Sequence, residues 1–255
     1  MKILITNDDG VDAEGIRVLA ELLKSQHEVI IIAPSEERST TGHSLTLDKP
    51  LRLKELEKNL YSCSGFPADC VLIGLSKVLD KRPDLVISGI NRGGNLGQDI
   101  YYSGTVAGAR EAAFHGVPSI AVSTVIDFEN PTGPFNYLTA AKATLTLINS
   151  GLVSKLPERA HFNLNVPDCM TQELLGFKFS QLGIRSYSED ITQRKDMRGE
   201  YYYWVGGYYK GFEPIPGSDC QNVDQKYASI SILNFKGPLT DKECEWAHEI
   251  DNLKI

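Results

Sequence analysis

Long apolar stretches and excess positive charge are both missing from this chain. No stretch approaches the roughly 20 apolar residues that a membrane-spanning helix needs, so we expect no membrane partner. The N-terminus, MKILITND, has an apolar run that is too short for a signal peptide and ends in acids. Asp and Glu (33) outnumber Lys and Arg (26), and the net charge of −7 argues against binding to a nucleic-acid duplex. We therefore expect a cytoplasmic protein.

Paired cysteines are missing as well. The five cysteines form no CxxC pair and are widely spaced: Cys63, Cys70, Cys169, Cys220 and Cys244. Disulfide frameworks and zinc sites both need closer or more regular spacing. Because Cys70 lies in the apolar helical pattern ADCVLIGLSKVL, we expect a buried structural thiol there rather than a nucleophile.

Two nucleotide-binding motifs are also absent. The first apolar run is followed by neither a GxxxxGK[ST] motif nor a GxGxxG motif. Binding of ATP by a P-loop, or of NAD in the Rossmann manner, is therefore disfavoured.

Apolar runs and amphipathic patterns alternate through the first two thirds of the chain. The runs predict buried strands at 2–6, 27–35, 84–88 and 118–123. The patterns predict helices at 16–26, 67–79, 105–115 and 137–149. We expect Asp12 to cap the first helix and Pro67 to occupy the first position of the second. With 255 residues and 42% hydrophobic content, this order predicts an α/β fold for residues 1–177, a Rossmann-like, doubly wound, mostly parallel sheet.

The remainder, residues 178–255, has a different character. It is rich in Tyr, Gly and Ser, as in GEYYYWVGGYYKGF, which indicates hairpins and hence a β-rich extension. Such a segment either covers its own core or packs on another subunit, and the sequence leaves both alternatives open.

Two adjacent acids follow the first predicted strand, in NDDG. In doubly wound folds, sites gather in the loops after the carboxyl ends of strands, and adjacent carboxylates there suit Mg²⁺ or Mn²⁺. The alternative is that Asp8 or Asp9 caps the next helix while the other is solvated. The pair alone does not decide between them.

A long loop of Gly and Asn follows the third predicted strand, in SGINRGGNLGQDIYYSGT. Loops of this length in a compact domain are usually functional, and glycines let backbone N–H groups approach a ligand. Ser103 and Thr105 stand at a helix entrance, where they either cradle an anion or cap the helix. An acid pair, an anion cradle and no dinucleotide fingerprint together point to metal-assisted phosphate chemistry.

Two other classes of protein fit the sequence less well. A phosphatase of the haloacid dehalogenase type would use a covalent phospho-aspartate, but it needs DxD followed by Gly-Thr. A non-enzymatic receiver-like module that binds Mg²⁺ needs an Asp at the end of a middle strand, where this chain has Ser88.

Four stretches resemble the SurE (survival protein E) family of 5′/3′-nucleotidases: MKILITNDDGVDAEGIRVLAELL, IIAPSEERS, DLVISGINRGGNLGQDIYYSGTVAGAREAAFHGVPSIAVS and FNLNVP. The resemblance implies a Rossmann-like domain with a C-terminal β-hairpin extension, assembled as a homodimer or homotetramer. It also implies metal-dependent hydrolysis of nucleoside 5′- and 3′-monophosphates, and of short polyphosphate in some members.

The resemblance also implies roles for individual residues. One divalent ion per subunit, Mg²⁺ or Mn²⁺, would be held by Asp8, Asp9, Ser39 and Asn95, with Asp8 or Asp9 as the base. Phosphate would be bound by Asn95, Ser103, Gly104 and Thr105. Asn7 either orients Asp8 or only forms the turn.

The sequence departs from the family pattern at Phe66, near the expected site, and in SISILNF (229–235), which bears on C-terminal packing. Roles are also expected for four further side chains. His43 either protonates the leaving group or is solvated, and His115 meets a helix C-terminus. Tyr101 and Tyr102 either stack on a base or fill core or interface space.

Overall fold

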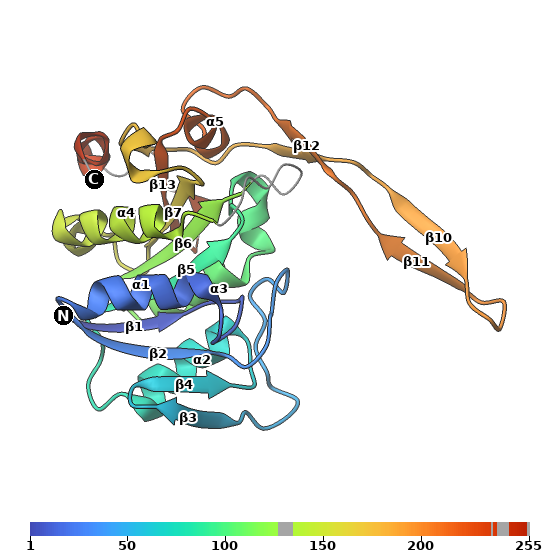
Figure 1. Ribbon diagram of the computed structural model, residues 1–255, viewed down its shortest axis with the longest axis horizontal. Helices are drawn as coiled ribbons and strands as arrows, with labels where there is room; N and C mark the ends of the chain where they lie inside the picture. Colours follow the sequence, from blue (N-terminus) through green and yellow to red (C-terminus); the bar gives the residue numbers. More distant parts are fainter. Residues whose placement is uncertain (127–134, 236, 239–244, 254–255) are drawn as a thin grey trace.

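The molecule is built around a mostly parallel β-sheet, drawn in Figure 1. The computed structural model describes residues 1–126, 135–235, 237–238 and 245–253. Strands of the sheet lie in the order β14-β13-β7-β6-β5-β1-β2-β4-β3, and β8 pairs with β13. Their bounds are β1 (Lys2–Thr6), β2 (Glu28–Pro34), β3 (Leu53–Glu57), β4 (Leu60–Cys63), β5 (Leu85–Arg92), β6 (Ser119–Val125), β7 (His161–Pro167), β8 (Phe177–Phe179), β13 (Ala228–Asn234) and β14 (Gly237–Pro238).

The strand order reverses beside β1. From β1 the chain passes through a helix to β2 on one side, and it later places β5 on the other side, with both pairs parallel. In open α/β sheets, ligands bind at this switch point, outside the carboxyl ends of the strands. The loops that follow β1 and β5 therefore lie where a ligand is expected to bind.

Helices cover both faces of the sheet. α1 (Glu14–Lys24) and α4 (Tyr137–Asn149) pack on one face, and α2 (Pro67–Ile73) and α3 (Gly104–Phe114) pack on the other (Figure 1). On α1 the apolar residues at helical spacing, Ile16, Leu19 and Leu23, are fully buried, as their spacing predicts. The doubly wound α/β architecture expected from the sequence is confirmed.

Shorter helical segments complete the chain. They are the π-helical turn η1 (Gly74–Val78), the 3₁₀ turns η2 (Gly97–Tyr101), η3 (Leu152–Lys155), η4 (Thr171–Glu173) and η5 (Glu245–Asn252), and the helix α5 (Asp219–Asp224).

One expectation about the helix starts is wrong and one is confirmed. The cap of α1 is Ala13, which makes no side-chain cap bond, and Asp12 is exposed one residue earlier. The prediction of Asp12 as N-cap is wrong because the preceding turn closes one residue later, with the N–H of Ala13 donating to the carbonyl of Gly10 at 3.1 Å. Pro67 does occupy the start of α2, as predicted.

Strand β5 continues to Arg92, into the segment expected to be loop. Its pairing with β6 shifts register between Ser88 and Asn91. Gly89, in this interval, has φ +138°, and a Cβ there would lie 2.3 Å from the carbonyl oxygen of Val122. Only glycine fits such a position, so this glycine serves the sheet and not a flexible loop.

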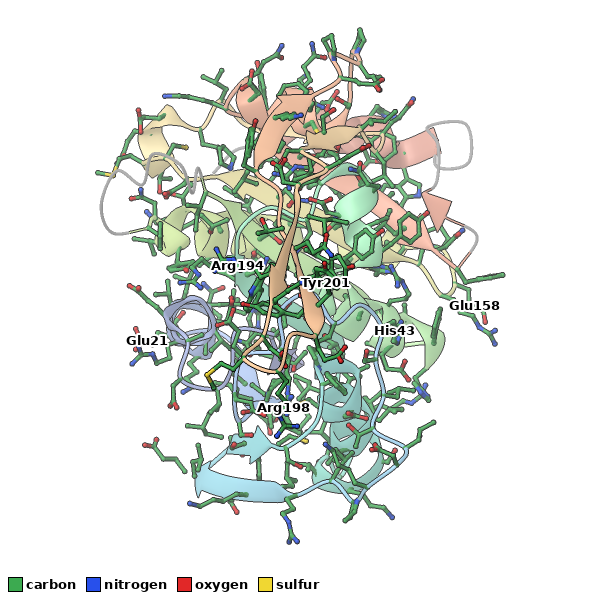
Figure 2. All side chains as sticks on the ribbon, turned by 90° about the vertical axis from the view of Figure 1, so that its right-hand side faces the viewer. Glu21, His43, Glu158, Arg194, Arg198 and Tyr201 are labelled. Atoms are coloured by element: carbon green, nitrogen blue, oxygen red, sulfur yellow. The ribbon has the colours of Figure 1, made fainter. Side chains whose placement is uncertain are left out.

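Residues 185–212 form an arm that projects from the body (Figure 1) and faces the viewer in Figure 2. Its root is β9 (Arg185–Tyr187) paired with β12 (Tyr209–Phe212), and its outer part is the antiparallel hairpin β10 (Ile191–Lys195) and β11 (Tyr201–Val205). The hairpins expected from the Tyr-rich pattern are present. Every residue of β10 and β11 is exposed, so this part does not cover its own core.

The chain returns from the arm to the sheet. After α5, strand β13 pairs antiparallel with β7, and Ser231 donates a hydrogen bond to the carbonyl of Ser180 at 2.9 Å. The departing sequence SISILNF therefore lies mostly within the main sheet.

Neither a membrane-spanning helix nor a disulfide is found in the described part of the chain. None of its helices is long and apolar enough to cross a bilayer. Its four cysteines are buried and free, and Cys244 lies outside the described residues.

Gly15 offers a test of how closely α1 packs on β5. A Cβ at Gly15 would lie 2.2 Å from the carbonyl oxygen of Ile90, which is backbone and cannot step aside cheaply. We expect Gly15→Ala to lower the free energy of unfolding by about 2 kcal/mol in urea denaturation. Glu21→Ala, on the exposed side of the same helix, is the control and should change stability little. Equal stability of both variants would contradict the close approach.

His161 predicts an acid-sensitive contribution to stability. The side chain is fully buried at the start of β7, and neither ring nitrogen has a hydrogen-bond partner among the described residues. Burial, together with the charges of Arg110 and His43, lowers the pKa of His161 to about 3. Since the unfolded chain binds this proton near pH 6.5, stability is full above that pH and falls as pH drops toward 3.

We expect the unfolding free energy of the wild type to fall between pH 6.5 and 4 faster than that of His161→Leu, by up to about 1.4 kcal/mol per pH unit. Urea denaturation at several pH values measures the difference. Parallel curves for the two proteins would show that His161 makes no such contribution.

Candidate active site

Loops from several strand ends open into one cleft of about 1380 Å³. Asp8 follows β1, Ser39 follows β2, and Asn95 follows β5, and all three line the cleft. Ser103, at the entrance of α3, lines it as well. The structure thus brings together polar residues from the three loops in which the sequence predicted a site.

Asp8 is held against the first turn of α3. Its Oδ1 accepts a hydrogen bond from the hydroxyl of Thr105, and a Cβ at Gly104 would lie 2.9 Å from the Cβ of Asp8. Burial raises the pKa of Asp8 to about 7; the bond from Thr105 opposes this, and the neighbouring Asp9 adds to it. The result is a buried carboxyl group whose charge needs a nearby cation.

Asp9 lies beside Asp8 but is not among the residues that line the cleft. Its Oδ2 accepts the backbone N–H of Arg92, at the end of β5, at 3.0 Å. Burial raises the pKa of Asp9, and the contact with Arg92 opposes that rise. The bond ties the acid pair to β5, across the switch point of the sheet.

The loop that carries Ser39 is fastened to the same place. The backbone N–H of Arg38 donates to the carbonyl of Asp8 at 2.7 Å. Ser39 is exposed, and its hydroxyl donates to Glu37 at 2.7 Å, which leaves lone pairs on the oxygen. Phe66, a departure from the family pattern, lies under this loop with the Arg38 guanidinium 5.2 Å from its ring centroid.

Asn95 is fixed by amide side chains of β7 and a hydroxyl of β6. Its backbone N–H donates to Asn165 at 2.8 Å, and its carbonyl accepts from Asn163 and Asn165 at 2.9 and 3.1 Å. Its side-chain Nδ2 donates to Ser123 at 2.8 Å. Oδ1 takes part in none of the hydrogen bonds of the described residues and is available to a ligand.

The entrance of α3 carries a side-chain cap. The Ser103 hydroxyl accepts the backbone N–H of Val106 at 3.0 Å and therefore caps α3. It also lines the cleft, so capping and ligand contact are compatible here. Gly104 and Thr105 do not line the cleft and contact Asp8 instead.

Asn7 and the histidines are engaged elsewhere. The side-chain amide of Asn7 donates to the carbonyl of Gly10 at 2.8 Å and so stabilises the turn. His43 lies 2.7 Å from Glu111, which also pairs with His115 at the end of α3. His43 is not among the cleft residues, so its placement does not support a role as proton donor to a leaving group.

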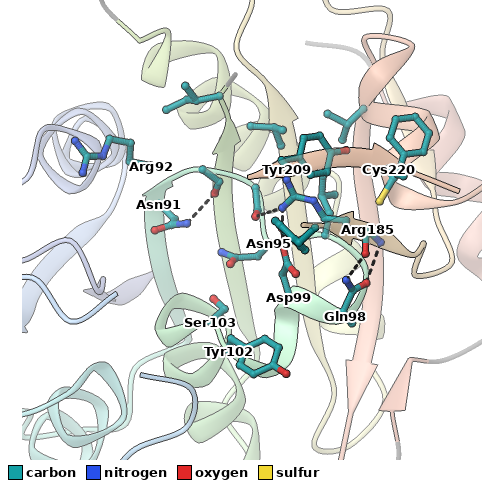
Figure 3. Close-up of a pocket in the computed structure, with 18 of the residues that line it drawn as sticks. Asn91, Arg92, Asn95, Gln98, Asp99, Tyr102, Ser103, Arg185, Tyr209 and Cys220 are labelled. Atoms are coloured by element: carbon teal, nitrogen blue, oxygen red, sulfur yellow. Dashed lines mark hydrogen bonds and ion pairs between the residues drawn. The ribbon is translucent and has the colours of Figure 1, made fainter. Parts of the chain in front are cut away.

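One wall of the cleft comes from residues that the sequence did not indicate. Arg185 and Tyr209, from the arm root, lie near Asn95 and Asp99 in Figure 3. Arg185 pairs with Asp99 at 2.6 Å. These partners are 86 residues apart in the chain, and no local pattern links them.

The donor set fits a hard divalent cation. It consists of two carboxylates, one amide oxygen and one hydroxyl, which are ligands of the type that Mg²⁺ and Mn²⁺ prefer. No group of three or more His, Cys, Asp and Glu side chains in the described part of the chain is arranged to hold a metal. An ion here would therefore depend on Asn95 and Ser39 as well as on the acid pair.

Comparison with known proteins identifies the family of this chain. A family model described as survival protein SurE matches residues 3–189. A protein named 5′-nucleotidase SurE from Thermosipho melanesiensis is 46% identical over 92% of this chain and 91% of its own length. One of the same name from Geotalea uraniireducens is 45% identical over 92% and 93%.

A solved structure gives the same result for the fold. The crystal structure of the SurE protein from Aquifex aeolicus superposes with a TM-score of 0.81 at 35% identity, over 99% of each chain. The family model covers well over half of this chain, and the relatives cover nearly all of it. The chain therefore belongs to the survival protein SurE family.

Proposed function

We propose that this protein is a divalent-metal-dependent phosphatase that hydrolyses nucleoside 5′-monophosphates to nucleoside and phosphate. The observation that carries the proposal is a single cleft lined by a buried acid, an amide and a helix entrance. The relatives' name, 5′-nucleotidase, supports the nucleotide as substrate. The proposal also includes nucleoside 3′-monophosphates, which are phosphate monoesters, and short-chain polyphosphate, whose terminal phosphoryl group is held by an anhydride bond.

Asp8, Asp9, Ser39 and Asn95 would hold one Mg²⁺ or Mn²⁺ per subunit. When bound, such an ion withdraws charge from the phosphoryl group and lowers the pKa of a water molecule. The raised pKa of Asp8, which burial causes, supports this assignment because a cation would offset that burial.

The protein's own groups bind and orient the phosphate. The Ser103 hydroxyl lines the cleft at the positive end of α3 and would donate a hydrogen bond to the phosphate, whereas Gly104 and Thr105 contact Asp8. The side chain of Asn95, in the same loop as Ser103, would contribute a further contact. One carboxylate of the Asp8–Asp9 pair accepts the proton of the attacking water, and Thr105 keeps Asp8 oriented through its hydroxyl.

Direct attack by water is favoured over a covalent aspartyl phosphate of the haloacid dehalogenase type. Family membership supports this choice, and so does NDDG, in which the acids are adjacent. Acid-quenched turnover with ³²P-labelled substrate should therefore yield no labelled protein.

The organisation of the chain follows from the same proposal. Residues 1–177 form the catalytic core, and within residues 178–255 the arm (185–212) is the extension used to assemble a homodimer or homotetramer, whereas β13 returns to the main sheet. Exposed aromatic side chains on β11, among them Tyr203 and Trp204, support contact with a partner.

The metal requirement is tested by assaying AMP, GMP, CMP, their 3′ isomers and polyphosphate with and without EDTA. We expect EDTA to abolish hydrolysis and Mn²⁺ or Mg²⁺ to restore it. Asp8→Asn should lower kcat by at least about a hundredfold while the melting temperature is kept or raised. The control is Asp12→Asn, an exposed acid in the same turn, which should be fully active. A rate that is insensitive to EDTA would refute the metal mechanism.

Gly104 provides a second test, directed at the position of Asp8. A Cβ at Gly104 would press on the Cβ of Asp8 at 2.9 Å, so we expect Gly104→Ala to displace the carboxylate. The expected result is a fall in kcat of about a hundredfold. Gly151→Ala is the matched control, because no atom lies within 4 Å of a Cβ there, although φ is +78°. It should cost some stability and leave kcat unchanged. Equal kcat values for the two variants would contradict the proposed packing.

A further inference from the structure

The cleft is larger than a metal and a phosphate require. Its volume of about 1380 Å³ exceeds that of most small-molecule pockets. Beyond the acid pair the lining becomes apolar, and a cluster of packed side chains supplies it: Leu96, Val125, Phe212, Cys220 and Val223. This part of the cleft offers apolar surface to the rest of a substrate whose phosphate, under the proposed function, is bound at Asn95 and Ser103.

An aromatic ring stands at this apolar wall. Tyr209, in β12, lines the cleft, and 38% of its surface remains exposed. The guanidinium carbon of Arg185 lies 4.4 Å from the centre of the Tyr209 ring, and the Tyr187 ring lies 5.8 Å away, tilted by 57°. The ring is therefore supported by neighbours from the arm root and still accessible.

The support behind the ring is itself fixed. Arg185 pairs with Asp99 at 2.6 Å, and Asp99 also accepts a hydrogen bond from the Tyr187 hydroxyl. Gln98 bonds both backbone groups of Arg185, donating at 2.6 Å and accepting at 2.9 Å. Arg185 and Tyr187 are thus held in place by Gln98 and Asp99, and they in turn fix the position of the Tyr209 ring.

The platform is also positioned relative to the phosphate site. Gln98 and Asp99 belong to η2, which connects Asn95 to Ser103. Asp219 accepts the backbone N–H groups of Gly97 and Gly183 at 2.8 and 2.7 Å, which joins the same segment to the start of the arm. In Figure 3, Tyr209 and Arg185 lie on the opposite side of Asn95 from Arg92.

We propose that Tyr209, backed by Arg185, is a stacking platform for the nucleobase of the substrate, an inference that rests on the proposed nucleotidase function. Every nucleobase has a π face, and a ring that is already fixed loses little conformational freedom on stacking. Val125, Phe212 and Val223 cover the apolar edges of the bound nucleoside. Tyr209 acts on substrate affinity and takes no part in the chemical step.

The test compares a substrate with a base and one without. Steady-state kinetics on AMP and on ribose 5-phosphate are measured for the wild type, Tyr209→Leu and Tyr209→Phe. We expect Tyr209→Leu to raise KM for AMP about tenfold, with kcat and the KM for ribose 5-phosphate within about twofold of wild type. Tyr209→Phe, which keeps the ring, should restore the KM for AMP. Tyr61→Leu, on β4 and outside the cleft, is the control and should match wild type.

Adenosine binding by calorimetry supplies a readout that does not depend on catalysis. We expect Tyr209→Leu to bind adenosine about tenfold more weakly than wild type. If Tyr209→Leu fails to fold, Tyr209→Trp replaces it: adenosine should quench the added tryptophan fluorescence, and ribose 5-phosphate should not.

The outcomes separate the two proposals. KM values that rise together for both substrates, or that do not rise for AMP, would overturn the platform and leave the nucleotidase function standing. A wild-type protein that hydrolyses neither substrate would refute the proposed function, and the adenosine measurements would still decide whether Tyr209 binds a base.

Discussion

The carboxylate of Asp8, buried against the first turn of α3, is the contact on which the cleft is built. It receives the Thr105 hydroxyl and packs directly on the backbone at Gly104, where a side chain would collide with it. Its backbone carbonyl holds Arg38 and hence the Ser39 loop. Since an isolated buried carboxylate is unfavourable, the surrounding fold is stable around it only as a neutral acid or beside a cation. When this side chain is ionised, its burial therefore favours a cation in the cleft.

The two ends of the loop after β5, which lines the cleft, are each held by their own hydrogen bonds. The Asn165, Asn163 and Ser123 side chains fix Asn95 from the neighbouring strands, so the loop after β5 is anchored despite its glycines. The Ser103 cap fixes the other end of the same loop. A glycine-rich segment is usually flexible, but here its glycines permit close backbone approach while amide side chains supply rigidity. Such preorganisation favours binding of a small, highly charged group.

The arm root connects the site to the most exposed part of the molecule. Arg185, in β9, pairs with Asp99, which lies in the segment between Asn95 and Ser103. From β9 the chain continues into the projecting hairpin. The side chains of this ion pair are only 15% and 20% exposed, so breaking it would leave a poorly solvated charge beside the cleft. The projecting hairpin and the cleft thus share a structural element.

The sequence by itself determined the layout of the core and the chemical type of the site. Buried strands such as 2–6 read as continuous apolar runs because both faces of a parallel strand are covered, and Ile16, Leu19 and Leu23 followed helical spacing. The acid pair and the SGT entrance were recognisable because their chemistry is local. Packing decided three other features: the cap at Ala13, the strand conformation of residues 89–92 and the hydrogen bond from Thr105 to Asp8. It also decided the wall formed by Arg185 and Tyr209, because contacts across about 90 residues depend on the path of the chain in space and leave no periodic trace in the sequence.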